Sequence, residues 1–410
     1  MLFQFCAAPA RYEPLNRPDI HYPVSSFGGL LSCCFYLLTP TARQGYVDVF
    51  RYQPNYHALE CVARQQAWQQ PLAADQALLA IAGNYWMVVN KYGEYSPYGV
   101  ALDAGILVAQ ANYLTQLCEL HSSACPESLP ALQALLVDNQ SATQIFAAQT
   151  LRFQQPPWQL LQSNAADTRI AVWQEPSIAY ASLPNLPALF NLFATPAPTP
   201  EPSSSAPSGS APVTLPTTDV LRVMQRRTAA NDAVGFAQKT PPLSRQFLTD
   251  FLQTREQLAQ RRERLAGESL LTMQVAWINP FGVEQGLYDG QGQALRLPAD
   301  KEAFLDQLRD CLYSSQQKYN IASLTMELFI TVEPQQWLAA YGDSSLRLAH
   351  MAAGAVAHDI ALTASLFGAF ARPVRMFRDT ALQQRLGLTG QLLVQVLVGF
   401  HRHHNFAVKL

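Results

Sequence analysis

The chain has 410 residues, a formal net charge of −2, 49% hydrophobic residues and only 14% charged residues. Its length allows two or three domains with sizeable cores, and its near-neutral charge gives no indication of a nucleic-acid partner or of an anionic membrane surface. No run of residues approaches the roughly 20 apolar positions that a membrane-spanning helix needs. The longest apolar stretch, residues 351–370, contains His358 and Asp359 and is predicted to be a buried core helix.

The seven cysteines form no pair with C-x-x-C spacing, and their number is odd. A reduced, cytoplasmic protein is the simplest interpretation. Residues 1–17 lack a basic segment followed by a long apolar core, so no secretory signal is expected. Residues 401–404 read His-Arg-His-His and lack the spaced ligand pairs of zinc sites, so no metal site is predicted.

The first half of the chain begins with short apolar runs. Aromatic-rich runs at residues 31–39 and 46–52 predict two strands. Residues 78–90 are interpreted as a further strand that leads into Lys91-Tyr92-Gly93-Glu94, and a long helix is predicted at residues 101–120.

The clearest boundary lies at residues 195–218, which are dominated by Pro, Ser, Ala and Thr and show no apolar periodicity. Such a segment buries too little surface to offset its ordering entropy, and it is predicted to be an extended linker. It separates two predicted domains of about equal size, residues 1–194 and 219–410.

The second half repeats this order of elements. A strand is predicted at residues 271–278, a hairpin at 286–288 and 293–295, another strand at 324–332, and a helix at 348–367. Strands and helices interleave in both halves, so the predicted class is α+β or α/β with a central sheet in each half.

One motif occurs in both halves. Lys91-Tyr92-Gly93-Glu94 is matched by Ala340-Tyr341-Gly342-Asp343, and a glycine follows fourteen residues after the start of each motif, at Gly105 and Gly354. A repeat of this long period predicts two copies of one structural unit. Only the first copy keeps an ionisable lysine beside the tyrosine.

The order strand, Gly-Leu-Tyr hairpin, Ala-Leu, strand, Tyr-Gly and Ala-Gly helix resembles that of the nitroreductase-like flavoproteins. More narrowly, it resembles the SagB-type dehydrogenases, which oxidise azolines to azoles in thiazole/oxazole-modified peptides. Residues 386–388 and 398–400 also resemble the C-terminal end of that family. The resemblance implies an α+β fold with tandem nitroreductase-like domains that form an intrachain pseudo-dimer, and FMN as the cofactor.

The resemblance also implies cofactor-binding residues. Arg226-Arg227-Thr228 is similar to the family's Arg-Arg-Ser/Thr signature, whose guanidinium and hydroxyl bind the FMN phosphate. Arg402 follows the last predicted strand, where the family often has a basic residue, and is a candidate second phosphate contact. The alternative for Arg226 and Arg227 is a solvated, basic helix start. Ala230 departs from the family, which often has a basic residue there to contact the flavin ring.

A second segment is predicted to lie against the flavin. Ser25-Ser26-Phe27-Gly28-Gly29 resembles a degraded form of the family's Pro-Ser-x-Gly segment. Gly28 and Gly29 would let the backbone approach a flat ring closely. The alternative is a simple turn before a strand.

Lys91 and Tyr92 match the catalytic Lys-Tyr pair of the azoline dehydrogenases. Lys91 is the candidate base, provided that partial burial lowers its pKa, and Tyr92 would position the base or relay the proton. The alternative is an exposed loop lysine beside a core tyrosine, because Tyr341 persists in the copy that lacks the lysine.

The motifs are divided between the halves, which predicts one composite FMN site with the phosphate held by the second half and the ring by the first. The expected function is oxidation of azolines to azoles in a ribosomally made peptide, with the peptide and a cyclodehydratase complex as partners. Two alternatives remain: a general NAD(P)H-dependent nitroreductase or flavin reductase, and a non-catalytic scaffold subunit of a peptide-modifying complex. Further association of the pseudo-dimer is left open.

Overall fold

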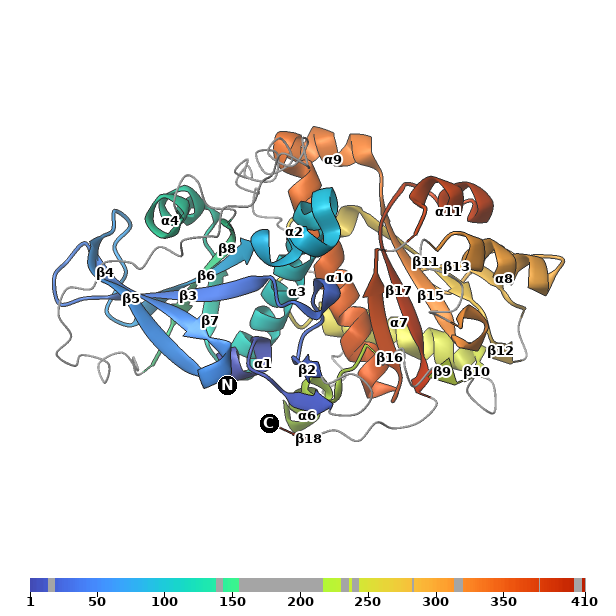
Figure 1. Cartoon of the computed structure of the whole chain (residues 1–410), viewed down its shortest axis with the longest axis horizontal. Coiled ribbons are helices and arrows are strands. Elements are labelled where there is room, and N and C mark those ends of the chain that lie inside the picture. Colours follow the sequence, from blue (N-terminus) through green and yellow to red (C-terminus); the bar gives the residue numbers. More distant parts are fainter. Residues whose placement is uncertain are drawn as a thin grey trace.

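The computed structural model describes residues 1–13, 19–137, 143–154, 217–229, 236–237, 243–281, 284–312, 320–375, 377–401 and 408–409. Two units, each an antiparallel sheet with a long helix on one face, lie side by side, and their long helices α3 and α10 meet between the sheets (Figure 1).

The sheet of the first unit has the strand order β5-β4-β3-β6-β8-β7, and every neighbouring pair is antiparallel. Its strands are β3 (Cys33–Pro40), β4 (Tyr46–Gln53), β5 (Ala58–Ala67), β6 (Gln76–Asn84), β7 (His121–Ala124) and β8 (Thr143–Arg152). Strand β6 is buried on both faces. Leu79 and Ile81 lie in the core beneath α3 (Ser96–Leu117), whereas Leu78 and Ala80 lie in the core beneath α4 (Leu129–Leu136).

The sheet of the second unit has the order β14-β13-β11-β15-β17-β16, and β9 pairs with β17. Its strands are β9 (Phe236–Ala237), β11 (Leu271–Trp277), β13 (Gly286–Asp289), β14 (Ala294–Arg296), β15 (Met326–Val332), β16 (Phe370–Val374) and β17 (Gln391–His401). Leu328 of the central strand packs towards α10 (Ser345–Leu366), and Phe329 packs towards α8 (Lys301–Asp310) and α11 (Asp379–Leu386).

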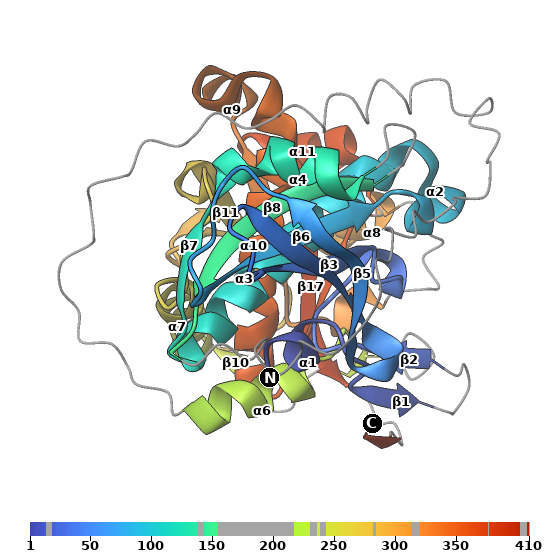
Figure 2. The ribbon, with the colours of Figure 1, turned by 90° about the vertical axis from the view of Figure 1, so that its left-hand side faces the viewer.

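Short elements connect the two units. Strands β1 (Arg11–Glu13), β2 (Asp19–His21) and β18 (Val408–Lys409) form a separate sheet in which Arg11 pairs with Lys409, so both ends of the chain lie on the same side of the molecule (Figure 2). The remaining elements are α1 (Leu2–Cys6), α2 (Trp86–Tyr92), α6 (Thr217–Arg226), β10 (Leu243–Ser244), α7 (Arg245–Ala259), β12 (Pro280–Phe281) and α9 (Pro334–Tyr341). Among the described residues, no helix is both long and apolar enough to cross a membrane.

The repeat seen in the sequence is also a repeat of structure. In each unit a short helix, a 3-10 turn and a central helix of 22 residues follow one another, with Gly93 and Gly342 at the first junction. The two glycines have nearly the same backbone angles, φ 53° and ψ −128° against φ 52° and ψ −136°. Both take a positive φ that other residues rarely adopt, which explains why the glycine recurs.

The predicted α+β class is confirmed, and the α/β alternative is wrong because both large sheets are antiparallel. The prediction of a strand through residue 90 is also wrong. Strand β6 ends at Asn84, whose side-chain oxygen accepts the Trp86 N–H at 2.8 Å as α2 begins. The last two residues of the predicted linker, Thr217 and Thr218, belong to α6; the rest of it lies outside the described residues.

Candidate functional site

Arg227 joins the two motifs that the sequence separates by about two hundred positions. It follows α6, its side chain is buried, and its guanidinium donates four hydrogen bonds to the segment before β3. The acceptors are Pro23 O at 2.7 Å, Ser25 Oγ at 3.0 Å, Tyr22 O at 3.0 Å and Val24 O at 3.1 Å. Arg227 therefore positions the segment that carries the predicted flavin-contacting residues.

The neighbours of Arg227 have different environments. Arg226 is the last residue of α6 and is exposed, whereas Thr228 is half-buried and its carbonyl oxygen accepts the Ala371 N–H at 3.2 Å. Arg226 is thus the motif's solvent-facing cation. Ala230 and Arg402 lie outside the described residues.

The other end of the same segment meets the Lys-Tyr motif. Lys91 lies in the last turn of α2 and is exposed, and its Nζ donates to Gly28 O at 3.3 Å. The rings of Tyr92 and Phe27 pack with their centroids 4.0 Å apart. Because Lys91 is exposed, the chain alone does not provide the burial on which its predicted role as a base depends.

The two glycines of the segment differ in what surrounds them. Gly28 has φ 67°, and a Cβ on it would lie 2.4 Å from Tyr92 Oη. Gly29 has φ 75° and faces open space, with no atom within 4 Å of the position of a Cβ. Both are exposed. Gly28 is therefore required by its backbone conformation and by the close approach of the tyrosine, and Gly29 leaves room for a ligand.

Asp103, on α3, is a site residue that the sequence interpretation missed. Its carboxylate accepts the Phe27 N–H at 2.7 Å and the Ser32 hydroxyl at 2.6 Å, and it is buried. Desolvation raises the pKa of Asp103 to about 7, against the lowering effect of these hydrogen bonds. The residue at the same offset in the second copy is Ala352. The available signal was a lone carboxylate in the apolar helix α3, at an offset where the second copy has an alanine.

Ser26 fixes the same turn from within. Its Oγ accepts the Leu31 N–H at 3.1 Å, and Leu31 itself has a positive φ of 47°. Together with Asp103, this bond holds the turn between the segment and β3 in a single conformation. Ser25 and Ser26 therefore serve different purposes, because Ser25 is bonded to Arg227.

The second unit contributes a neutral aromatic contact nearby. The rings of Tyr98 and His350 lie 5.0 Å apart at the junction of α3 and α10. Desolvation lowers the pKa of His350 to about 3, with a further contribution from Arg375, so its imidazole is neutral at physiological pH. Tyr98 is the neighbour of Gly99, where a Cβ would lie 2.1 Å from the ring of Phe27.

These residues fit the two parts of an FMN molecule. A flat ring needs a backbone surface without side chains, which the exposed Gly28 and Gly29 supply. A phosphate needs a cation, which Arg226 offers. In the described residues, no group of three or more His, Cys, Asp and Glu side chains gathers to hold a metal ion.

Comparison with solved structures identifies the fold. A protein of Anabaena variabilis, provisionally named a nitroreductase, matches with a TM-score of 0.71 over 98% of this chain and 87% of that chain. The chain has the nitroreductase fold. Because one chain of the Anabaena protein matches nearly all of this one, both units, in tandem, belong to this fold. The two chains are 16% identical, so their similarity shows the fold alone.

Other matches are partial. The E. coli microcin synthetase McbBCD complex with truncated pro-MccB17 bound matches with a TM-score of 0.36 and 13% identity, over 61% of this chain and 89% of that chain. A Staphylococcus epidermidis protein provisionally named an NAD(P)H:FMN oxidoreductase matches with a TM-score of 0.33 and 12% identity, over 49% and 96%. These scores are too low to carry an argument. No protein-family model matches the chain, and no curated protein sequence matches it.

Proposed function

We propose that the chain binds one FMN along residues 22–29 and acts as an oxidoreductase that converts azolines to azoles in a ribosomally made peptide. The observation that carries this proposal is that residues 22–29 are anchored by both the Arg-Arg-Thr motif and the Lys-Tyr motif. Arg227 of the second half holds the segment at Ser25, and Lys91 of the first half bonds to it at Gly28. Gly28 is three positions after Ser25, so their Cα atoms are at most about 11 Å apart.

The reaction removes a proton from carbon and a hydride from the azoline ring. When bound, FMN supplies the acceptor for the hydride. Lys91 is assigned the proton, which its Nζ accepts when the amine is neutral. A flavin ring and a substrate that cover the exposed Lys91 would remove water from its amine. Loss of water lowers the pKa of a lysine and so favours the neutral amine. The Gly28 carbonyl orients the Nζ, and Tyr92 holds the turn that presents this carbonyl.

One observation favours a second candidate, a non-catalytic scaffold subunit of a peptide-modifying complex. Four of the guanidinium bonds of Arg227 go to the protein itself. If the neighbouring Arg226 does not bind a phosphate, the motif would have only this structural role. Flavin binding therefore separates the two candidates.

The test is the visible absorption spectrum of the purified chain, followed by titration with FMN. We expect about one FMN per chain. Arg226→Ala is expected to weaken FMN binding at least tenfold, since a charged hydrogen bond to phosphate is lost. Arg222→Ala, which removes another exposed arginine of α6, serves as the matched control. No binding at excess FMN supports the scaffold, whereas reduction of nitroaromatics by NADPH without azoline oxidation supports the general reductase.

A further inference from the structure

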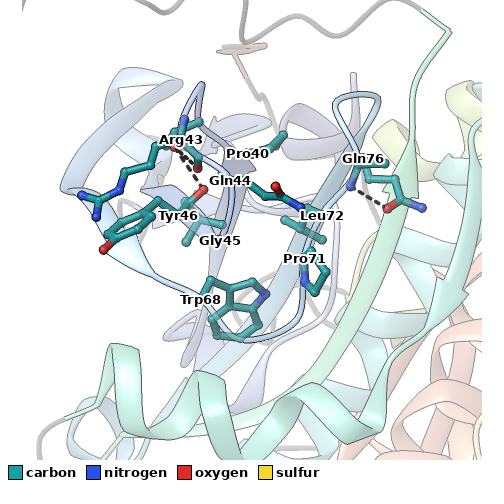
Figure 3. Close-up of a pocket in the computed structure, with 12 residues that line it drawn as sticks. Pro40, Arg43, Gln44, Gly45, Tyr46, Trp68, Pro71, Leu72 and Gln76 are labelled. Carbon is teal, nitrogen blue, oxygen red and sulfur yellow. Dashed lines mark hydrogen bonds between the residues drawn. The ribbon is translucent and has the colours of Figure 1, made fainter.

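A cavity of about 340 Å³ lies at the end of the first sheet where β3 and β4 are connected. It opens between the β3–β4 connection and the β5–β6 connection (Figure 3). This volume is at the small end of the range for ligand pockets and has room for one or two amino-acid residues. None of the residues assigned above to the flavin or to the chemistry lines it.

Rings form much of the wall of this cavity. Trp68, Tyr46, Pro40 and Pro71 are among the residues that line it (Figure 3). Trp68 is 5% exposed and forms the floor, so its position is fixed by the core beneath it. The ring surface that a ligand can cover therefore comes from Pro40, Tyr46 and Pro71, which are half-buried or exposed. Such flat, stiff surfaces are complementary to other rings and cost little conformational entropy when they are covered.

A cation is held at the rim. The guanidinium of Arg43 lies over the ring of Tyr46, with its Cζ 3.8 Å from the ring centroid. Arg43 is exposed, and in the part of the chain that the structure describes no carboxylate lies within ion-pair distance of it. The stacking leaves the guanidinium N–H groups at the rim available to a ligand that carries negative charge.

The turn that presents Arg43 is already formed. The Thr41 hydroxyl donates to Arg43 O at 3.0 Å, and the Arg43 N–H donates to the Thr41 oxygen at 3.2 Å. The backbone N–H of Trp68 donates to Gly45 O at 2.8 Å, which ties the turn to the floor. A preformed pocket of this kind binds without paying for loop ordering.

We propose that this pocket binds an extended segment of another polypeptide that contains proline beside an acidic residue. Aromatic-lined grooves recognise proline-rich segments because the polyproline II helix is preformed and its rings stack on aromatic faces. Proline has no backbone N–H, so its burial against apolar walls leaves no donor unsatisfied. The carboxylate of the acidic residue pairs with Arg43 at the rim.

A labelled peptide Pro-Ala-Pro-Thr-Pro-Glu-Pro, added to the full chain and followed by fluorescence polarisation, tests the proposal. We expect saturable binding that Tyr46→Leu weakens about tenfold, because the stacking surface is lost. Arg43→Gln should weaken it by up to about fivefold, the effect of an exposed ion pair. The same loss should follow when Gln replaces Glu in the peptide, and the two losses should not add. Arg385→Gln, an exposed arginine of the second unit, should change nothing.

Three results would overturn the proposal. No saturable binding removes it, and equal binding of a peptide with alanine at every proline removes the requirement for proline. The third concerns the source of the ligand, because residues 196–202 of the chain have the sequence of the probe. If the full chain with Pro198, Pro200 and Pro202 replaced by Ala binds the peptide more tightly than the wild type does, the pocket is occupied in cis and the partner is not another polypeptide.

Discussion

Gly105 of α3 and Gly354 of α10 each lie against the backbone of the other's helix. A Cβ on Gly105 would be 1.8 Å from Met351 O, and a Cβ on Gly354 would be 2.1 Å from Leu102 O. Met351 lies three residues before Gly354 in α10, and Leu102 lies three residues before Gly105 in α3. The contact is therefore reciprocal. The two helices cross so closely that neither position has room for a Cβ. This explains why the glycine recurs at the same offset in both copies.

The first prediction concerns this crossing. Gly→Ala inside a helix normally stabilises it by about 1 kcal/mol. At Gly105 or Gly354 we expect the opposite sign, a loss of about 2 kcal/mol or more in the free energy of unfolding, because the new methyl group would overlap a carbonyl oxygen. Denaturant unfolding of each variant measures this. A gain in stability for either one would show that the helices lie further apart than the structure has them.

Several features of the fold could be predicted from the sequence because they depend on local patterns. The buried strands follow from apolar runs, and the two equivalent units follow from the repeated Tyr-Gly motif. The meeting of Arg227 with Ser25 could be expected only from the family resemblance, since no local pattern links residues so far apart. The role of Asp103 was missed for a related reason: its partners, Phe27 and Ser32, are brought to it by tertiary packing.

The second prediction concerns a buried ion pair of the second unit, Arg262 with Asp359, that also accepts a hydrogen bond from the first unit. The Asp359 carboxylate accepts from Arg262 Nε at 3.0 Å and Nη2 at 2.7 Å, and from the Tyr113 hydroxyl at 2.9 Å. Asp359→Asn should lower the free energy of unfolding by about 3 kcal/mol, since it leaves a buried guanidinium with less compensating charge. Tyr113→Phe, which removes one hydrogen bond, should cost about 1 kcal/mol. If urea unfolding gives equal losses of stability for Asp359→Asn and Tyr113→Phe, the ion pair contributes no more than the single hydrogen bond and the prediction is wrong.

The third prediction is a pH dependence of stability. Glu327, buried in β15, accepts a hydrogen bond from Gln395, and desolvation raises its pKa from 4.5 to about 7. Between these values the folded state binds more protons than the unfolded state, so stability falls as pH rises and levels off above about pH 7. The contribution lost over this range is on the order of 3 kcal/mol.

Substitution separates this contribution from others in the same pH range. Glu327→Gln keeps the shape and removes the titration, so the difference in unfolding free energy between wild type and variant should change between pH 4.5 and 7. Asp103 also has a pKa raised to about 7 and titrates in both proteins, so it cancels in the difference. A difference that is constant with pH would show that Glu327 does not keep its proton in the fold.

The fourth prediction is coupling between Arg227 and Ser25. Ser25→Ala removes the acceptor for one charged hydrogen bond and should lower stability by about 1 to 2 kcal/mol. Arg227→Met should cost more, because it also leaves three backbone carbonyls without their donor. In the double variant the losses should not add, and the difference is the coupling energy. Strict additivity would mean that the bond contributes nothing to holding residues 22–29.

The fifth prediction concerns Lys91. Lys91→Ala should reduce the rate of azoline oxidation by about 10² to 10⁴-fold, the usual contribution of a positioned base, while FMN remains bound. The bond that the lysine makes to Gly28 is exposed, so little stability should be lost with it. Lys91→Arg is the informative companion, because arginine can still donate to the Gly28 carbonyl but stays protonated and cannot accept a proton. If Lys91→Arg retains full activity while Lys91→Ala does not, the lysine serves to hold the turn, and the base is another group.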